Sequence, residues 1–447
     1  MQTSFSPELL ADPAMAASEA VIRKCVHCGF CTATCPTYVL LGDELDSPRG
    51  RIYLMKDMLE NQREPTAEVV KHIDRCLSCL SCMTTCPSGV NYMHLVDHAR
   101  AYIEGRYRRP RLERLIRHML AMVLPYPRRF RFALSLARLV RPAAPLAGRF
   151  PALRPVAAML TLAPRRMPAR APAPASAAPA ASTVPATKRR VALLQGCAEP
   201  VLRPEFRAAA LRLLSRAGFN VVLASGEGCC GALVHHMGKE KASLEAARRN
   251  VDVWSREIEE NGLEAIVVTA SGCGVTIRDY GFMLRGDPAY AEKAARVSAL
   301  AMDITELLDA TALPAGNGRN LRVAYHAACS LQHGQKVTQA PRRLLSAAGY
   351  DVRLPAEAHL CCGSAGTYNI LQPEIAGQLG DRKAANLDRL EADVIATGNI
   401  GCVVQIAQRT GTPIVHIVEL LDWATGGPPP PAFKDHDERI SRDPNLA

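Results

Sequence analysis

Sixteen cysteines are the residues of this chain whose type and spacing could do chemistry. Eight of them form two runs with the spacing C-x2-C-x2-C-x3-C, each followed by a proline. The first run is Cys25, Cys28, Cys31 and Cys35, and the second is Cys76, Cys79, Cys82 and Cys86. Runs of this kind bind [4Fe-4S] clusters through three thiolates of their own and a fourth thiolate from the other run. The spacing therefore predicts two clusters.

This crossed pattern assigns a ligand role to every cysteine of the two runs. Cluster 1 is expected to use Cys25, Cys28, Cys31 and Cys86. Cluster 2 is expected to use Cys76, Cys79, Cys82 and Cys35. A pair of structural zinc sites is the alternative, because zinc also favours C-x2-C units, but zinc has no use for the interlocked pattern.

The other eight cysteines form a second repeat. Cys197, Cys229, Cys230 and Cys273 are matched by Cys329, Cys361, Cys362 and Cys402, at offsets of 132, 132, 132 and 129 residues. We expect at least one additional metal or redox site in these repeats. The alternative is that the thiols are buried packing residues, as free cysteines often are.

The elements around the second set of cysteines alternate between strand and helix. In the first copy, strands are expected at 191–194, 221–223 and 265–269, with helices at 204–217 and 244–258 between them. The key cysteines directly follow these strands, where open α/β sheets place their ligands. The fold class predicted for the chain is an α-helical ferredoxin module followed by two α/β, Rossmann-like, cysteine-rich repeats.

The order of these patterns predicts the domain organisation. Ser47-Pro48 begins a helix between the two cysteine runs, which indicates a helical module rather than a hairpin. The expected segments are a two-cluster ferredoxin domain (1–105), a basic amphipathic segment (106–170), a Pro/Ala linker (171–187), the first cysteine-rich domain (188–318), the second (319–425) and a tail (426–447).

Charge is concentrated in the basic segment. It contains sixteen arginines and one acidic residue, Glu113, in a chain of net charge +11. Arginines interleaved with leucine and phenylalanine predict peripheral contact with a membrane, and docking of an acidic partner subunit is the alternative. Nucleic-acid binding is not expected, because no nucleic-acid module accompanies the charge. Neither a membrane-spanning run nor a secretory signal is expected, so the predicted location is cytoplasmic, with contact at the cytoplasmic face of the inner membrane.

Four motifs resemble those of the iron-sulfur subunit of bacterial glycolate oxidase (glycolate dehydrogenase), which has two cysteine-rich CCG domains. They are Cys25–Tyr38, Leu41–Leu54, Ala270–Gly274 and Cys361–Tyr368. The resemblance implies that flavoprotein subunits oxidise glycolate or D-lactate, and that this chain carries the electrons toward a quinone-type acceptor. The wider superfamily, which includes anaerobic glycerol-3-phosphate dehydrogenase and heterodisulfide reductase, gives the alternative function.

The resemblance also implies that this chain holds no catalytic residue. No flavin or nicotinamide fingerprint is present, and hydride chemistry needs an organic two-electron carrier. In the superfamily the CCG motif often ends in C-x2-C, but here Ala270 and Asn399 replace the first of these cysteines. His235, His236, His326 and His333 lie near the cysteines and could serve as ligands or hydrogen-bond donors, with ordinary packing as the alternative.

Overall fold

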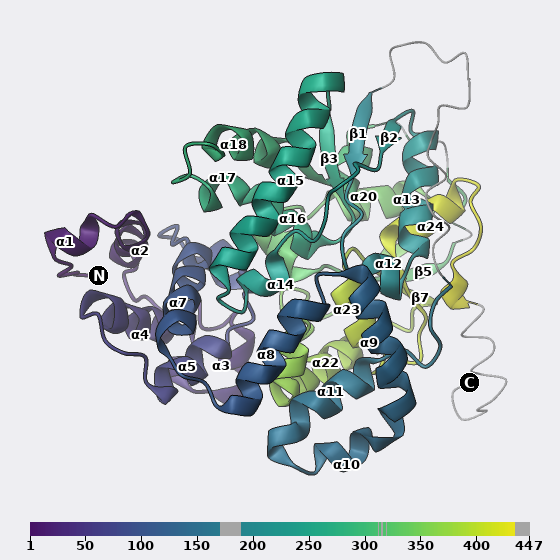
Figure 1. Ribbon diagram of the computed structural model, residues 1–447. Coiled ribbons are helices and arrows are strands. Elements are labelled where there is room, and N and C mark those ends of the chain that lie inside the picture. The colour runs from purple at the N-terminus through teal and green to yellow at the C-terminus, as the bar shows by residue number, and fades with distance from the viewer. Residues whose placement is uncertain (170–188, 312, 314–315, 319, 434–447) are drawn as a thin grey trace.

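The computed structural model describes residues 1–169, 189–311, 313, 316–318 and 320–433. The predicted linker at 171–187 lies outside the described residues, as does most of the predicted tail. Figure 1 shows a helical N-terminal region, an arm of helices that follows it, and a larger region of strands and helices.

The N-terminal region is helical, as the sequence predicts. Its elements are α1 (Pro7–Leu10), α2 (Pro13–Lys24), α3 (Pro36–Leu41), η1 (Glu44–Asp46), α4 (Pro48–Glu60), α5 (Ala67–Asp74), α6 (Ser81–Thr85) and α7 (Tyr92–Arg106). The Ser47 hydroxyl accepts a hydrogen bond from the Gly50 amide at 3.0 Å and so caps α4. Ile52, Met55 and Leu59 of α4 are buried against α7, which fixes the frame between the two cysteine loops.

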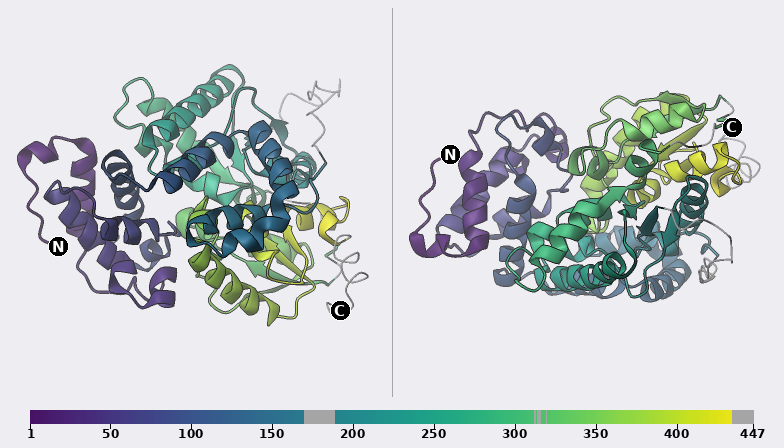
Figure 2. Two further views of the ribbon diagram at one scale, coloured as in Figure 1. Left: turned by 60° about the horizontal axis from the view of Figure 1, so that its bottom comes forward. Right: turned by 90° about the horizontal axis from the view of Figure 1, so that it is seen from above.

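The basic segment folds into an arm of short helices. They are α8 (Arg111–Val123), α9 (Pro127–Val140), η2 (Arg141–Ala143), α10 (Ala144–Gly148), η3 (Pro151–Leu153) and α11 (Arg154–Leu162). Ile116 and Leu120 of α8 pack with Val234, Met237 and Ile370 from the region that follows. The arm is thus anchored by one apolar face, and Figure 2 shows it lying across the strand-containing region.

The rest of the chain contains two four-stranded parallel sheets, with strand orders β2-β1-β3-β4 and β6-β5-β7-β8. The first unit contains β1 (Arg190–Leu193), α12 (Glu199–Leu202), α13 (Glu205–Arg216), β2 (Asn220–Val222), α14 (Ala232–His235), α15 (Glu240–Asn261), β3 (Ala265–Val268), α16 (Ser271–Arg278), α17 (Tyr280–Met283), α18 (Ala291–Leu300), β4 (Ala301–Asp303) and α19 (Ile304–Asp309). The second contains β5 (Arg322–His326), η4 (Ser330–Gly334), α20 (Ala340–Ala347), β6 (Asp351–Arg353), α21 (Tyr368–Leu371), α22 (Pro373–Asp388), β7 (Val394–Thr397), α23 (Ile400–Ile406), β8 (Ile414–His416) and α24 (Ile417–Ala424).

Successive side chains along a strand point to opposite faces of the sheet, and each face packs against its own set of helices. Val191 and Leu193 of β1 pack into the core that includes α13 and α19, whereas Ala192 packs on the opposite face with Trp254 of α15. The first of these cores continues into the second unit, where Val323 of β5 joins it. The two α/β units therefore share one hydrophobic core.

The expected strands and helices of the first unit are present, with ends shifted by a few residues. The fourth strand of each unit was not predicted. Both β4 and β8 have only three residues and run directly into a helix, α19 and α24, so no separate strand pattern stands out in the sequence. They pair with β3 and β7 at the edge of each sheet.

Candidate metal centres

The first cysteine run lies on the loop between α2 and α3. Cys25, Cys28 and Cys31 line one pocket with Cys86, from the end of α6, and Cys82 of the second run borders the same pocket. Cys28 is exposed, so this pocket reaches the surface. Gly29 has a φ of +84°, a conformation that glycine adopts without strain, and the Arg49 guanidinium packs closely over it.

The second run has the same backbone trace in a more buried place. Ser78 and Leu80 have φ values of +51° and +63° at the positions that correspond to His27 and Gly29. Burial raises the pKa of Cys79 and Cys82 well above the usual thiol range, and the negative charge of Cys35 raises both further. The charge of Cys35 therefore acts on the second run as well as on Cys31 of its own run, and the charge of Cys86 acts on Cys25 of the first run.

Arg51 is a polar neighbour of the cysteines that the sequence analysis missed. Its guanidinium is 1% exposed and lies 3.8 Å from the Cys35 sulfur. It also donates to Asp46 at 3.2 Å and to the Thr37 hydroxyl at 3.0 Å. Tyr92 plays a similar part, since its hydroxyl donates to the Cys76 sulfur at 3.8 Å. Such donors stabilise negative charge on cysteine sulfur.

The first α/β unit brings its four cysteines together in a chain of contacts. Cys197 and Cys230 donate hydrogen bonds to the Cys229 sulfur, which hold the pKa of Cys229 well below its usual value. Cys273 contacts Cys230 in turn. Asn250 binds the Cys229 carbonyl at 3.2 Å and the Gly228 amide at 2.9 Å, so the loop that carries the cysteine pair is held to α15.

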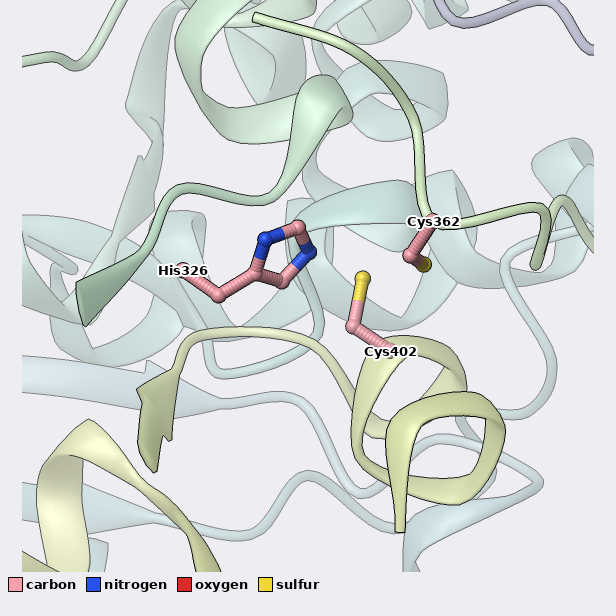
Figure 3. Close-up of side chains that lie close together, drawn as sticks. All are labelled: His326, Cys362 and Cys402. Carbon is pink, nitrogen blue, oxygen red and sulfur yellow. The ribbon is translucent and has the colours of Figure 1, made fainter. Parts of the chain in front are cut away.

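The second α/β unit also brings its four cysteines together, since Cys361 interacts with both Cys329 and Cys362. The sulfurs of Cys329 and Cys361 lie 3.7 Å apart. At the other end, the ligand atoms of Cys362, Cys402 and His326 all lie within 4.8 Å of one another. Figure 3 shows the His326 ring, from the end of β5, directed toward the two sulfurs.

The second cysteine run adjoins the second α/β unit. Cys79 and Leu77 pack in one apolar cluster with Cys361 and Tyr368, and Cys329 borders that cluster. The Tyr368 hydroxyl donates to the Arg75 carbonyl at 2.9 Å across the same boundary. Thiols of the second run and of the second α/β unit therefore border one apolar cluster, and the charge of Cys329 acts on Cys79.

Among the described residues, three of the four histidines considered above belong to no cluster of metal-ligating side chains. His235 pairs with Asp97 at 3.2 Å, and His333 bonds Thr84 at 2.8 Å and the His359 carbonyl at 3.0 Å. Both join the ferredoxin-type region to an α/β unit. His236 is buried, and burial lowers its pKa to about 4.

The donor sets can be tested against the metal groups that they imply. All sixteen cysteines are free of disulfides. Among the described residues, none of the ferredoxin-type cysteines belongs to a set of three ligands within 4.8 Å of one another. A four-iron cube is bound at separate corners and needs its thiolates spread around a pocket, so the wide spacing fits a cube better than a single ion.

Comparisons with known proteins agree with this geometry. The 4Fe-4S dicluster domain family matches residues 24–90, and the cysteine-rich domain family matches residues 191–278 and 323–407. The glycolate oxidase iron-sulfur subunit of Escherichia coli is 42% identical over 95% of this chain and 99% of its own length. The chain belongs to the glycolate oxidase iron-sulfur subunit family. It is an iron-sulfur subunit with a dicluster domain for [4Fe-4S] clusters and two cysteine-rich domains.

Other similar proteins include the probable glycolate oxidase iron-sulfur subunit of Bacillus subtilis, 32% identical over 91% of this chain and 95% of that protein. Lactate utilization protein A of Bacillus licheniformis is 28% identical over 52% of this chain and 99% of its own length. A solved structure of a hypothetical protein from Helicobacter pylori matches 94% of this chain and 74% of that one, with a TM-score of 0.54 and 11% identity. That likeness shows the fold alone.

Among the described residues, no helix is both long and apolar enough to cross a bilayer.

Proposed function

We propose that this chain relays electrons from a flavoprotein subunit, which oxidises glycolate or D-lactate to the 2-oxo acid, toward a quinone-type acceptor. The observation that carries the proposal is a surface thiol site and a buried thiol site, side by side in a member of the glycolate oxidase iron-sulfur subunit family. When bound, [4Fe-4S] clusters exchange single electrons, which suits passage from a two-electron flavin to an acceptor.

The proposed ligands follow the crossed pattern. Cys86 completes the site of Cys25, Cys28 and Cys31: these four thiols line one pocket together with Cys82, and the charge of Cys86 acts on Cys25. Cys35 completes the site of the second run, supported by its electrostatic effect on Cys79 and Cys82. Arg51 would donate a hydrogen bond to the Cys35 thiolate and offset its charge. The whole chain is proposed to act as an electron-transfer subunit with no substrate oxidation of its own.

The difference in exposure between the two cluster sites suggests the direction in which we propose that electrons move. Cys28 is exposed, and the neighbouring Val26 and Phe30 are 66% and 63% exposed. Large apolar side chains at a pocket rim are typical of docking surfaces. We place the flavoprotein contact here. The second site lies deeper, where the buried Cys79 packs in one apolar cluster with Leu77, Tyr368 and Cys361 of the second cysteine-rich domain.

The Phe30→Glu variant tests this contact. We expect delivery of electrons from the reduced flavoprotein to slow about tenfold, because a central apolar contact is typically worth more than 1 kcal/mol. Stopped-flow bleaching of the visible cluster absorption measures the rate. Leu354→Glu is the matched control, since Leu354 is also exposed but lies in the second cysteine-rich domain. Equal slowing in both variants, or in neither, would argue against the contact.

The helical arm carries a second interaction surface. Among the described residues, eleven of the seventeen large apolar side chains that are exposed lie between 112 and 150. They are Leu112, Leu115, Met119, Met122, Tyr126, Phe132, Leu136, Leu139, Val140, Leu146 and Phe150. We propose that this face lies at the headgroup boundary of an anionic membrane, with exposed arginines such as Arg128 and Arg138 beside the phosphates.

Some arginines of the basic segment are buried in ion pairs and do not contribute charge to this surface. Arg109 and Arg117 are buried and bind Asp74 at 2.6 Å and 2.8 Å, and both also contact Glu113. Together these ion pairs hold the start of the arm against α5. The charge available to lipid is therefore smaller than the arginine count of the segment indicates.

Liposome flotation tests the membrane contact. The Arg128→Gln/Arg138→Gln double variant is expected to bind anionic vesicles about thirtyfold less tightly, since each arginine near the surface contributes about 1 kcal/mol. Phe132→Ser/Leu136→Ser/Leu139→Ser should also weaken flotation, because these side chains follow one face of α9 at helical spacing. Leu354→Ser is the control. Equal flotation of the unaltered chain on neutral and anionic vesicles would contradict the proposal and favour an acidic protein partner.

A further inference from the structure

The two cysteine-rich domains differ at one position that bears on metal binding. His326 ends the first strand of the second domain, three residues before Cys329, and the residue three before the matching Cys197 is Leu194. Leu194 packs in an apolar cluster with Cys230, Val251 and Trp254. The first domain therefore has no nitrogen ligand where the second has an imidazole.

The imidazole of His326 is buried, and its polar neighbour is the Cys362 thiol. Its side chain is 1% exposed, and among the described residues neither ring nitrogen makes a hydrogen bond with a nitrogen or oxygen atom, whereas Cys362 interacts with the ring. A buried polar group that only a weakly hydrogen-bonding thiol faces is under-satisfied, and a metal ion bound between the two would satisfy both. The ring is directed at the sulfurs of Cys362 and Cys402, which are 0% and 1% exposed (Figure 3).

The spacing of these three donors matches a single ion. Tetrahedral metal–sulfur and metal–nitrogen bonds of about 2.3 Å and 2.0 Å place neighbouring donor atoms between about 3.4 Å and 3.8 Å apart. The ligand atoms of His326, Cys362 and Cys402 already lie within 4.8 Å of one another, so small side-chain movements complete the geometry. Apart from this trio, the described residues contain one other such set, Asp43, Asp46 and His72, where Arg51 and Arg75 already bind Asp46.

The surroundings of the trio support thiolate ligands. The Asn399 side-chain amide lies 3.6 Å from the Cys402 sulfur, as a donor to a thiolate would. Lys383 is 2% exposed and is held by the Glu357 carbonyl at 2.7 Å. In the first domain the position that corresponds to Asn399 is Ala270. Outer-shell donors of this kind orient metal ligands and tune their charge.

We propose that the second cysteine-rich domain binds one thiophilic divalent metal ion, with Zn²⁺ as the preferred ion, through His326, Cys362 and Cys402. The first domain lacks this site. Three protein ligands leave the fourth position of a tetrahedral ion to water or to the adjacent Cys361 thiol. The site is separate from the two ferredoxin-type sites, and it does not depend on the proposed route of electrons.

Metal analysis of the anaerobically purified full chain tests the site. After dialysis against Zn²⁺ and a wash with a weak chelator, about one zinc per chain should remain beside the iron of the dicluster domain. His326→Leu places in the second domain the residue that the first domain already accommodates. It should lose this zinc while its iron content and the electron paramagnetic resonance of the reduced clusters stay unchanged.

X-ray absorption at the zinc edge should show two sulfur ligands, or three if Cys361 takes the fourth position, and at least one nitrogen or oxygen ligand. Cys230→Ser, which changes the first-domain counterpart of Cys362, should retain the zinc, and His326→Gln checks the role of the ring if the leucine variant folds poorly. Retention of zinc in both His326 variants would overturn the proposal. A spectrum with four sulfur ligands would also overturn it. So would the finding that the His326 variants lose several irons together with sulfide instead of one zinc ion.

Discussion

Changing Cys35 to alanine is expected to remove the cluster bound through Cys76, Cys79 and Cys82 and to leave the other cluster in place. Cys35 belongs to the first run by sequence, but in the structure its charge acts on Cys79 and Cys82. Two [4Fe-4S] clusters hold about eight irons, so the iron content should fall to about four per chain. Iron and acid-labile sulfide analysis measures this loss.

The reciprocal variant provides the control. Cys86→Ala should remove the cluster bound through Cys25, Cys28 and Cys31, because Cys86 lines their pocket. Each variant should then keep a different paramagnetic resonance signal after reduction. If Cys35→Ala disturbed only the cluster of Cys25, Cys28 and Cys31, the crossed assignment would be wrong.

The isolated chain is expected to show no glycolate-dependent or D-lactate-dependent reduction of a dye, and the flavoprotein partner should restore it. Oxidation of a 2-hydroxy acid transfers two electrons and a proton or hydride, which requires an organic carrier held against the substrate. The sequence has no G-x-G-x-x-G after a strand that would bind such a carrier. The rate of dye reduction should therefore rise from background to full turnover when the chain and the flavoprotein are mixed.

The appropriate control uses the same partner with the Cys35→Ala/Cys86→Ala variant, which lacks one proposed ligand of each cluster. Flavoprotein plus this variant should support much slower transfer to a quinone acceptor than flavoprotein plus the unaltered chain. Rapid turnover by the isolated chain, free of flavin, would refute the electron-transfer assignment.

The features that the sequence predicts well are the ones encoded locally or by repetition. The C-x2-C-x2-C-x3-C runs specify tight loops, and Ser47-Pro48 specifies a helix start, so the loops and α4 are found where expected. The 132-residue repeat likewise predicts two α/β units, because matched strands and helices recur around matched cysteines.

The features that it does not predict depend on contacts between distant segments. Arg51 is one arginine among many in the sequence, and only folding places it beside Cys35. His326 is three residues from Cys329 in sequence, yet it faces Cys362, from the loop between β6 and α21, and Cys402 of α23. In the basic segment, folding changes which residues are available at the surface. It pairs Arg109 and Arg117 with Asp74 and leaves apolar side chains exposed.

Iron and sulfide analysis with electron paramagnetic resonance of the reduced, anaerobically purified full chain tests the central claim most directly. We predict a brown protein with about eight irons and eight sulfides in the dicluster domain and two mutually interacting paramagnetic clusters after reduction. A colourless protein with about two zinc ions in the ferredoxin-type runs and no sulfide would contradict the electron-transfer function and support a zinc-stabilised scaffold.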